Sequence, residues 1–167
     1  IKDNSRIWGD QYNRKMGDVF AIQEQITQEI SQKLRLRLSG EEKKLLAKRS
    51  TENLEAYKLY LQGRFYWNKR TPDDLYRAIS FFEKAVEIDP NYALGFASIA
   101  ETYTVLGSLA VEPSDVVFPK AEEYGLKALA LDENLPEAHT ALGAVKIWYK
   151  ADMKSAEQEY KKAVDLN

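Results

Sequence analysis

The chain has 167 residues, no cysteine, 30% charged residues and a formal net charge of −2 at pH 7. This length suits one domain with a sizeable core, and the missing cysteines exclude disulfides and thiolate metal sites. The small net charge argues against a protein dedicated to nucleic acid or to an anionic membrane surface. No apolar run approaches the roughly 20 residues that cross a bilayer, so we expect no membrane insertion of this segment.

The first fifty residues are predicted to form a short strand and then two helices. Residues 1–17 are interpreted as a short strand and linker, because the Arg-Ile-Trp run at 6–8 lies between turn residues. Residues 18–50 are interpreted as N-terminal capping helices. The first of them begins after Asp18, where Val19, Ile22 and Ile26 recur at helical spacing.

Small residues recur at fixed spacing in the rest of the chain. Three alanine pairs are each seven residues apart: Ala78 and Ala85, Ala121 and Ala128, Ala156 and Ala163. Upstream of each pair, one further small residue occupies a common position, held by Gly63, Ala100 and Gly143. Small side chains allow two helix backbones to approach closely, so the pattern predicts three consecutive helix pairs.

Several helix starts can be placed from their capping residues. Asn53 and Thr71 are predicted N-caps, and Thr71 is followed by Pro72, which suits the first position of a helix. The third pair is expected to open at Pro136, and its second helix near Asp152. The second helix of the middle pair should begin between residues 114 and 119, because Pro119 fits only a first turn without loss of a backbone hydrogen bond.

These repeats resemble the tetratricopeptide repeat (TPR) family. The first repeat matches the family pattern with Leu59, Gly63, Tyr66, Ala78, Phe82, Ala85 and Pro90, and the later repeats follow it with departures at Gly125 and Lys146. The resemblance implies an all-α fold, a right-handed TPR superhelix of three helix-turn-helix repeats at residues 53–91, 92–134 and 135–167. We expect the array to continue in a longer parent protein.

The segment up to about residue 38 resembles the end of the TolB-like amino-terminal domain that precedes TPR arrays in bacterial signalling proteins. That resemblance implies an effector outside this segment, such as a kinase, a nucleotide cyclase or a DNA-binding module. It leaves the compartment open between cytoplasm and periplasm, with a slight preference for the cytoplasm.

No catalytic, metal or cofactor site is predicted. The single histidine, His139, occupies the repeat position of Leu59 and Phe96, which favours packing over chemistry. Adjacent acidic pairs such as Glu41 and Glu42 point in different directions on a helix and are typical of a solvated face. The chain also lacks a phosphate-binding glycine loop, a nucleophile elbow and a zinc-binding HExxH motif, so we expect no enzyme activity.

The TPR resemblance implies a concave groove, lined by the first helix of each repeat, that binds a peptide or partner helix. A second stripe on the first helix, beside its packing stripe, repeats large aromatic residues and one arginine at helical spacing. The residues predicted to line the groove are Tyr57, Tyr60, Arg64, Trp67, Glu101 and Trp148. Two interpretations stay open: these aromatics contact an acidic, hydrophobic ligand, or the helix over residues 18–38 folds back and covers them.

The leading hypothesis is a non-catalytic interaction, scaffolding or sensing module of a larger bacterial signalling protein. The alternative is a structural spacer or dimerisation element that positions an effector, and we expect a homodimer formed through the last helix or the N-terminal segment. The aromatic and basic run at residues 64–70 suits nucleic acid, but the overall charge opposes it. The Lys and Asn clamp that TPR domains use for chaperone tails is not reproduced, so that ligand is not implied.

Overall fold

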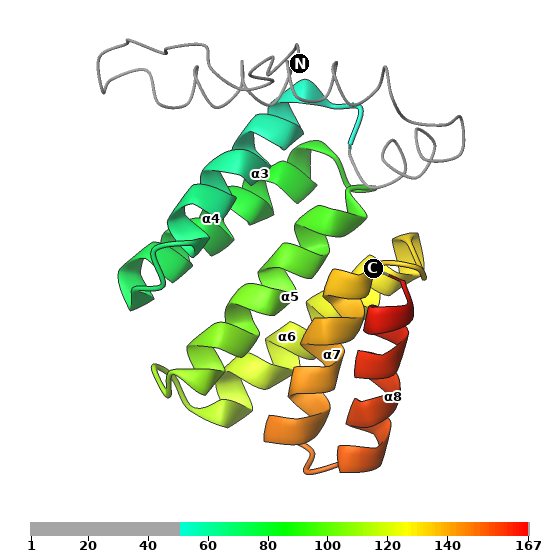
Figure 1. Cartoon of the computed structure of the whole chain (residues 1–167). Helices are drawn as coiled ribbons and strands as arrows, with labels where there is room; N and C mark the ends of the chain where they lie inside the picture. Colours follow the sequence, from blue (N-terminus) through cyan, green and yellow to red (C-terminus); the bar gives the residue numbers. More distant parts are fainter. Residues whose placement is uncertain (1–50, 167) are drawn as a thin grey trace, which may run out of the picture. The chain divides into compact units, whose positions relative to one another are not determined.

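The computed structural model describes residues 51–166. Within that range the chain forms six helices and no strand: α3 (Leu54–Trp67), α4 (Pro72–Ile88), α5 (Ala93–Ser108), α6 (Ser114–Leu131), α7 (Pro136–Trp148) and α8 (Met153–Asp165). They follow one another as three hairpin-like pairs (Figure 1). The predicted all-α solenoid of three helix pairs is confirmed, whereas the strand and capping helices predicted for residues 1–50 lie outside the described residues.

Two helices begin at the predicted capping residues, and α8 begins after Asp152, near which its start was predicted. The Asn53 side chain accepts hydrogen bonds from the backbone N–H groups of Glu55 and Ala56, and the Thr71 side chain accepts one from Asp74. Asp152 caps α8 in the same way, through the N–H of Ser155. These side chains satisfy backbone donors that a first helical turn leaves without partners, which is why the helices start there.

The recurring small residues lie where the helices pack. All six alanines of the three pairs are buried, as are Gly63, Ala100 and Gly143 at the common upstream position. A Cβ atom added at Gly63 would lie 2.4 Å from the ring of Phe82, a distance that real contacts do not reach. Glycine is therefore required there by the close approach of α3 and α4.

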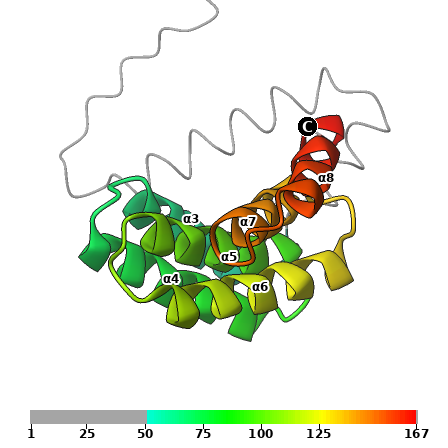
Figure 2. The same ribbon diagram turned by 90° about the horizontal axis from the view of Figure 1, so that it is seen from below.

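The helices form two layers, and α5 packs on α4, α6 and α7. Figure 2 shows α4 and α6 on one side and α3, α5 and α7 on the other. The main core lies between the layers and centres on Leu75, Phe82, Ile99, Leu106 and Phe118, all at most 2% exposed. The surface formed by α3, α5 and α7 on the side away from α4 and α6 is called the first-helix surface below.

The turn inside each helix pair has the same backbone feature. Arg70, Ala110 and Ala151 all adopt positive φ angles, of 58°, 51° and 52° respectively. Each residue follows the first helix of its pair by two or three positions. Because a left-handed conformation is unusual for a residue with a Cβ, its recurrence shows that the three turns are built alike.

One sequence expectation for the middle pair needs correction. The first helix of this pair continues to Ser108. The second begins at Ser114, inside the predicted window, which places Pro119 beyond the first turn rather than within it. Proline lacks the N–H that would reach the carbonyl of Asp115, so α6 lacks one interior hydrogen bond at an exposed position, where water can satisfy the carbonyl.

Candidate partner-binding surface

An aromatic and two guanidinium groups meet at the end of α3. The guanidinium carbon of Arg64 lies 4.1 Å from the ring centroid of Trp67, and that of Arg70 lies 3.5 Å from the same centroid. Arg64 precedes Trp67 by one helical turn, and the left-handed backbone at Arg70 brings the second side chain back toward the ring. We call Arg64, Trp67 and Arg70 the Arg-Trp-Arg cluster; such contacts are favourable because the ring face is electron-rich.

The cluster is linked to α5 by an ion pair. Nη1 of Arg64 donates a hydrogen bond to Oε2 of Glu101 at 3.3 Å, and both side chains are about one third exposed or less, at 32% and 19%. Burial raises the pKa of Glu101 to about 7, although Arg64 acts in the opposite direction. The site therefore contains a carboxylate that only partly retains its charge at neutral pH.

Two predicted groove residues on α3 contact aromatic neighbours. The ring of Tyr60 lies 5.7 Å from that of Phe82 and 5.5 Å from that of Tyr92, measured between centroids. Burial raises the pKa of Tyr60 to about 12, while Tyr57 stacks on Tyr60 at 6.3 Å between ring centroids. Tyr60 therefore contributes to the core of the described domain, and its role in partner binding stays a prediction.

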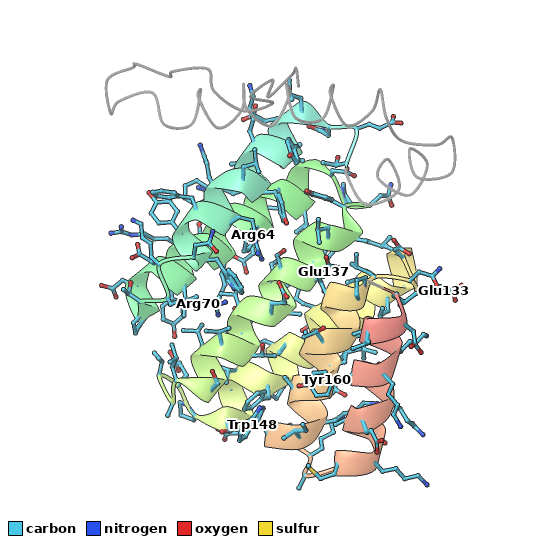
Figure 3. All side chains as sticks on the ribbon, viewed as in Figure 1. Arg64, Arg70, Glu133, Glu137, Trp148 and Tyr160 are labelled. Atoms are coloured by element: carbon cyan, nitrogen blue, oxygen red, sulfur yellow. The ribbon has the colours of Figure 1, made fainter. Side chains whose placement is uncertain are left out.

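Trp67 is also partly buried, and Trp148 is not. Trp67 packs against the main core, and its indole Nε1 is buried without a hydrogen-bond partner in the described part of the chain. Trp148 is 66% exposed at the last residue of α7. In Figure 3, Trp148 is labelled away from Arg64 and Arg70. The other five predicted groove residues are joined more closely to one another than to Trp148.

A small pocket beside Glu101 was not predicted from the sequence. It has a volume of about 250 Å³ and is lined by Glu101 of α5, Glu137 and Thr140 of α7, and Tyr160 and Val164 of α8, among others. Oε2 of Glu137 is buried and has no hydrogen-bond partner among residues 51–166. Glu137 occupies the repeat position of Tyr57, and this equivalence to a predicted groove residue was the signal that could have identified it.

The single histidine is a structural residue. His139 is 2% exposed, with Nδ1 2.7 Å from Oε2 of Glu159 and Nε2 3.0 Å from the carbonyl oxygen of Glu133. Burial opposes the charge on Glu159, but the hydrogen bonds from His139 and Lys146 outweigh it and lower its pKa. His139 therefore ties α8 to α7 and to the turn before it, in agreement with the packing interpretation.

The described residues show neither a metal cluster nor a membrane span. No group of three or more His, Cys, Asp or Glu side chains in this part of the chain could hold a metal ion. Likewise, none of the helices α3 to α8 is long and apolar enough to cross a bilayer. What the surface offers instead is a mixture of aromatic rings, guanidinium groups and carboxylates on α3, α5 and α7.

Residues 51–166 have a TPR-like all-α solenoid fold. No family model matches the sequence. The structure of the second TPR domain of Spaghetti (RPAP3), bound to the HSP90 peptide SRMEEVD, superimposes with a TM-score of 0.55 over 68% of this chain and 94% of that one, at 19% identity. At that identity the likeness establishes the fold alone.

Two kinds of curated protein are similar in sequence. The transcriptional regulator HilA of Salmonella typhimurium is 28% identical over 93 residues, which are 56% of this chain and 17% of HilA. The putative adenylate cyclase 3 of Rhizobium meliloti is 26% identical over 147 residues, which are 86% of this chain and 25% of the cyclase. The chain thus spans a quarter or less of the length of these relatives.

Proposed function

We propose that residues 51–166 form a non-catalytic interaction module that binds a peptide or partner helix on the first-helix surface, within a larger bacterial signalling or regulatory protein. The observation that carries this proposal is the Arg-Trp-Arg cluster joined to Glu101. Aromatic rings and guanidinium groups provide much of the energy of protein interfaces. Here the ion pair spans α3 and α5, so a ligand on this surface would contact two repeats at once.

The relatives support a module rather than a catalyst. A transcriptional regulator and a putative adenylate cyclase have different activities in their names, yet each is similar to this chain over a minor part of its length. A segment shared by proteins of different activity fits a module that serves either one. The RPAP3 domain, of the same fold, holds a peptide, which supports the same kind of ligand here.

The chemistry of the surface differs from a clamp for acidic tails. Arg64 is already paired with Glu101, and a second carboxylate, Glu137, lies near enough to raise the pKa of Glu101 further. The first-helix surface therefore carries both signs of charge. We expect a ligand with hydrophobic residues and with charges of both signs, rather than the acidic, hydrophobic ligand that the sequence stripe on α3 suggests.

The proposal can be tested by selecting peptides from a random display library on the purified chain and measuring their affinities by fluorescence anisotropy. Arg64→Glu should weaken a selected peptide by tenfold or more, because it places three carboxylates together in the site. Lys84 is an exposed residue of α4, away from the first-helix surface. Lys84→Glu makes the same charge change there and should alter the affinity less than twofold. Selected peptides that respond equally to both variants, or a selection without enrichment, would contradict the proposal.

A dimerisation role is the second candidate, and one observation favours it. α8 presents an apolar depression of about 440 Å³ lined by Ile147, Met153, Tyr160 and Val164, and Met153 and Val164 are 66% and 74% exposed. Exposed apolar surface of this kind is typical of helix docking. Sedimentation at high micromolar concentration should then show a dimer that Val164→Glu abolishes, and a strict monomer would remove this candidate.

A further inference from the structure

The pocket between α5, α7 and α8 has a chemistry different from the Arg-Trp-Arg cluster. Its polar lining consists of the carboxylates of Glu101 and Glu137 and the hydroxyl of Thr140, and its remaining lining is carbon-rich, from Pro136 and Val164 among others. The Thr140 hydroxyl donates to the carbonyl oxygen of Pro136. The pocket therefore combines hydrogen-bond acceptors with apolar lining.

The two carboxylates of this pocket are partnered unequally. Arg64 contacts Glu101 at 3.3 Å, and both Arg64 and Arg70 favour the charged form of that carboxylate. Oε2 of Glu137 is buried and has no partner in the described residues. A buried acceptor without a donor costs free energy, which a bound cation that donates a hydrogen bond to Glu137 would relieve.

We infer that this pocket binds the side chain of a lysine or arginine from the partner peptide, with the cationic head at Glu101 and Glu137 and the alkyl stem along Pro136 and Val164. The inference rests on the proposed function, since it specifies part of the ligand on the first-helix surface. Lysine and arginine combine a long apolar stem with a charged, donating end, which matches the mixed apolar and acceptor lining of the pocket. Tyr160 adds an aromatic ring to this lining, and such rings also attract cations.

The position of the pocket agrees with a ligand that crosses the surface. Figure 3 labels Arg64 and Glu137 on helices that lie on either side of α5, and Tyr160 on α8 beyond them. An extended peptide that contacts the Arg-Trp-Arg cluster with an acidic or aromatic residue would thus reach the pocket with a residue further along its chain. The ligand class is a peptide in which a basic residue follows or precedes an acidic and hydrophobic segment.

A pair of small probes tests the pocket without knowledge of the partner. The probes are Nα-acetyl-lysine N-methylamide and its norleucine counterpart, which has the same alkyl stem but no ammonium group. Titrated into the ¹⁵N-labelled chain, the lysine probe should shift the backbone amide signals around Glu101, Glu137 and Thr140. The norleucine probe should leave them in place, and equal shifts with both probes, or none with either, would overturn the inference.

Two matched substitutions locate the charge requirement. Glu137→Gln keeps the size of the side chain and should weaken the lysine probe at least about fivefold, because the pocket loses the negative charge of its unpartnered carboxylate. Glu133→Gln makes the same change at an exposed residue that does not line the pocket and should leave the affinity unchanged. Equal affinity of the probe for both variants would place binding elsewhere, and the spectrum of each variant shows whether it is folded.

The binding should also depend on pH in a defined direction. Glu101 is faced by Arg64 on α3, Arg70 after α3 and Glu137 on α7, and its pKa of about 7 means that it ionises between pH 6 and pH 8. A lysine ammonium stays charged over this range. The lysine probe should therefore bind about two- to fivefold more tightly at pH 8 than at pH 6, and the difference should disappear in Glu101→Gln.

The selected peptides separate this inference from the proposed function. If they bind the first-helix surface but carry no basic residue and do not respond to Glu137→Gln, the inference fails and the proposed function stands. If no peptide is selected while the lysine probe still shifts the pocket signals, the pocket stands and the proposed function fails. A third outcome supports both the inference and the proposed function. In it, replacing a lysine of the peptide by norleucine lowers the affinity for the native chain about tenfold and leaves the affinity for Glu137→Gln unchanged.

Discussion

The junction between the first two helix pairs is filled differently from the junction between the second and third. Tyr60 of α3 packs on Tyr92, directly before α5, and Arg64 pairs with Glu101 of α5, while the backbones of α3 and α5 approach each other less than those of α5 and α7 do. Between α5 and α7 lie the fully buried alanines Ala97 and Ala138, in one cluster with Leu135. Large side chains separate α3 from α5, whereas small ones allow close packing of α5 and α7. We call the first contact region the aromatic junction and the second the alanine junction.

This difference separates two tasks within one architecture. The alanine junction is packed by small apolar side chains, and its helix α7 also supplies Glu137 and Thr140 to the pocket. The aromatic junction places guanidinium groups and a carboxylate of raised pKa within reach of a ligand, at the cost of burying polar groups such as the Trp67 indole nitrogen. Polar groups held partly buried in this way are frequent at functional sites.

The largest expected effect comes from emptying the aromatic junction. Tyr60→Ala removes a ring that packs on Phe82 and Tyr92, so it should lower the free energy of unfolding by about 3 kcal/mol, as for other buried aromatics. Tyr76→Ala is the control, since Tyr76 is 40% exposed on α4 and should cost under about 1 kcal/mol. Urea denaturation of both variants measures the difference, and similar losses would mean that Tyr60 does not support the core.

A somewhat smaller effect should follow from overfilling the alanine junction. Ala97 and Thr140 occupy the same repeat position, but Ala97 is fully buried and Thr140 is exposed. Ala97→Leu should therefore cost roughly 1–3 kcal/mol by forcing α5 and α7 apart. Thr140→Leu should change the stability little. If both variants lost a similar amount of stability in thermal melts, α5 and α7 would be less closely packed than described.

The helix starts and the recurrence of small residues could be predicted from the sequence because local chemistry determines them. The capping residues Asn53, Thr71 and Asp152 act within one helical turn, and the two alanines of each pair lie on the same helix. Both signals can be recognised without knowledge of neighbouring repeats. Pro119 was misplaced because an exposed helix can lose one backbone hydrogen bond to water at small cost, which the proline rule for the first turn ignores.

The contacts between repeats were harder to predict. Arg64 and Glu101 were each assigned to the groove, but their ion pair joins residues 37 positions apart and depends on how the two repeats stack. The bonds of His139 to Glu159 and to the turn before α7 depend on the same kind of geometry. Opposite charges at equivalent repeat positions, as in Arg64 and Glu101, are the sequence signal that could have indicated the pairing.

A third prediction concerns the pH dependence of the aromatic junction. The pKa of Glu101 is raised by burial from 4.5 to about 7, so the folded chain binds a proton more tightly there than the unfolded chain does. Its stabilising contribution is fully present below about pH 4.5 and is lost as the pH rises through 7. Relative to the native chain, Glu101→Gln should therefore gain at least about 1 kcal/mol between pH 5 and pH 8.

Denaturation curves at the two pH values measure this change, and Glu123→Gln serves as its control. Glu123 is exposed on α6, so its substitution should shift the curves equally at both pH values. If Glu101→Gln also shifted them equally, the carboxylate would titrate as an ordinary surface group. That result would weaken the description of the junction as a partly buried polar site.

The smallest expected effect on stability belongs to the ion pair itself. Arg64→Ala should cost about 1 kcal/mol or less, because partly exposed ion pairs contribute little and the arginine stem adds modest packing against Trp67. Its effect on a bound peptide should be larger than its effect on folding. Isothermal titration and thermal melts on the same variant compare the two, and a greater loss of stability than of binding would assign Arg64 to structure alone.

The most direct measurement of the central claim is a chemical-shift map of a selected peptide on the ¹⁵N-labelled chain. The account predicts that the perturbed amides lie on α3, α5 and α7, with the largest shifts near Arg64, Glu101 and Glu137. It also predicts that the exposed faces of α4 and α6 remain unchanged. Perturbations concentrated on α4 and α6, or confined to α8, would contradict the assignment of partner binding to the first-helix surface.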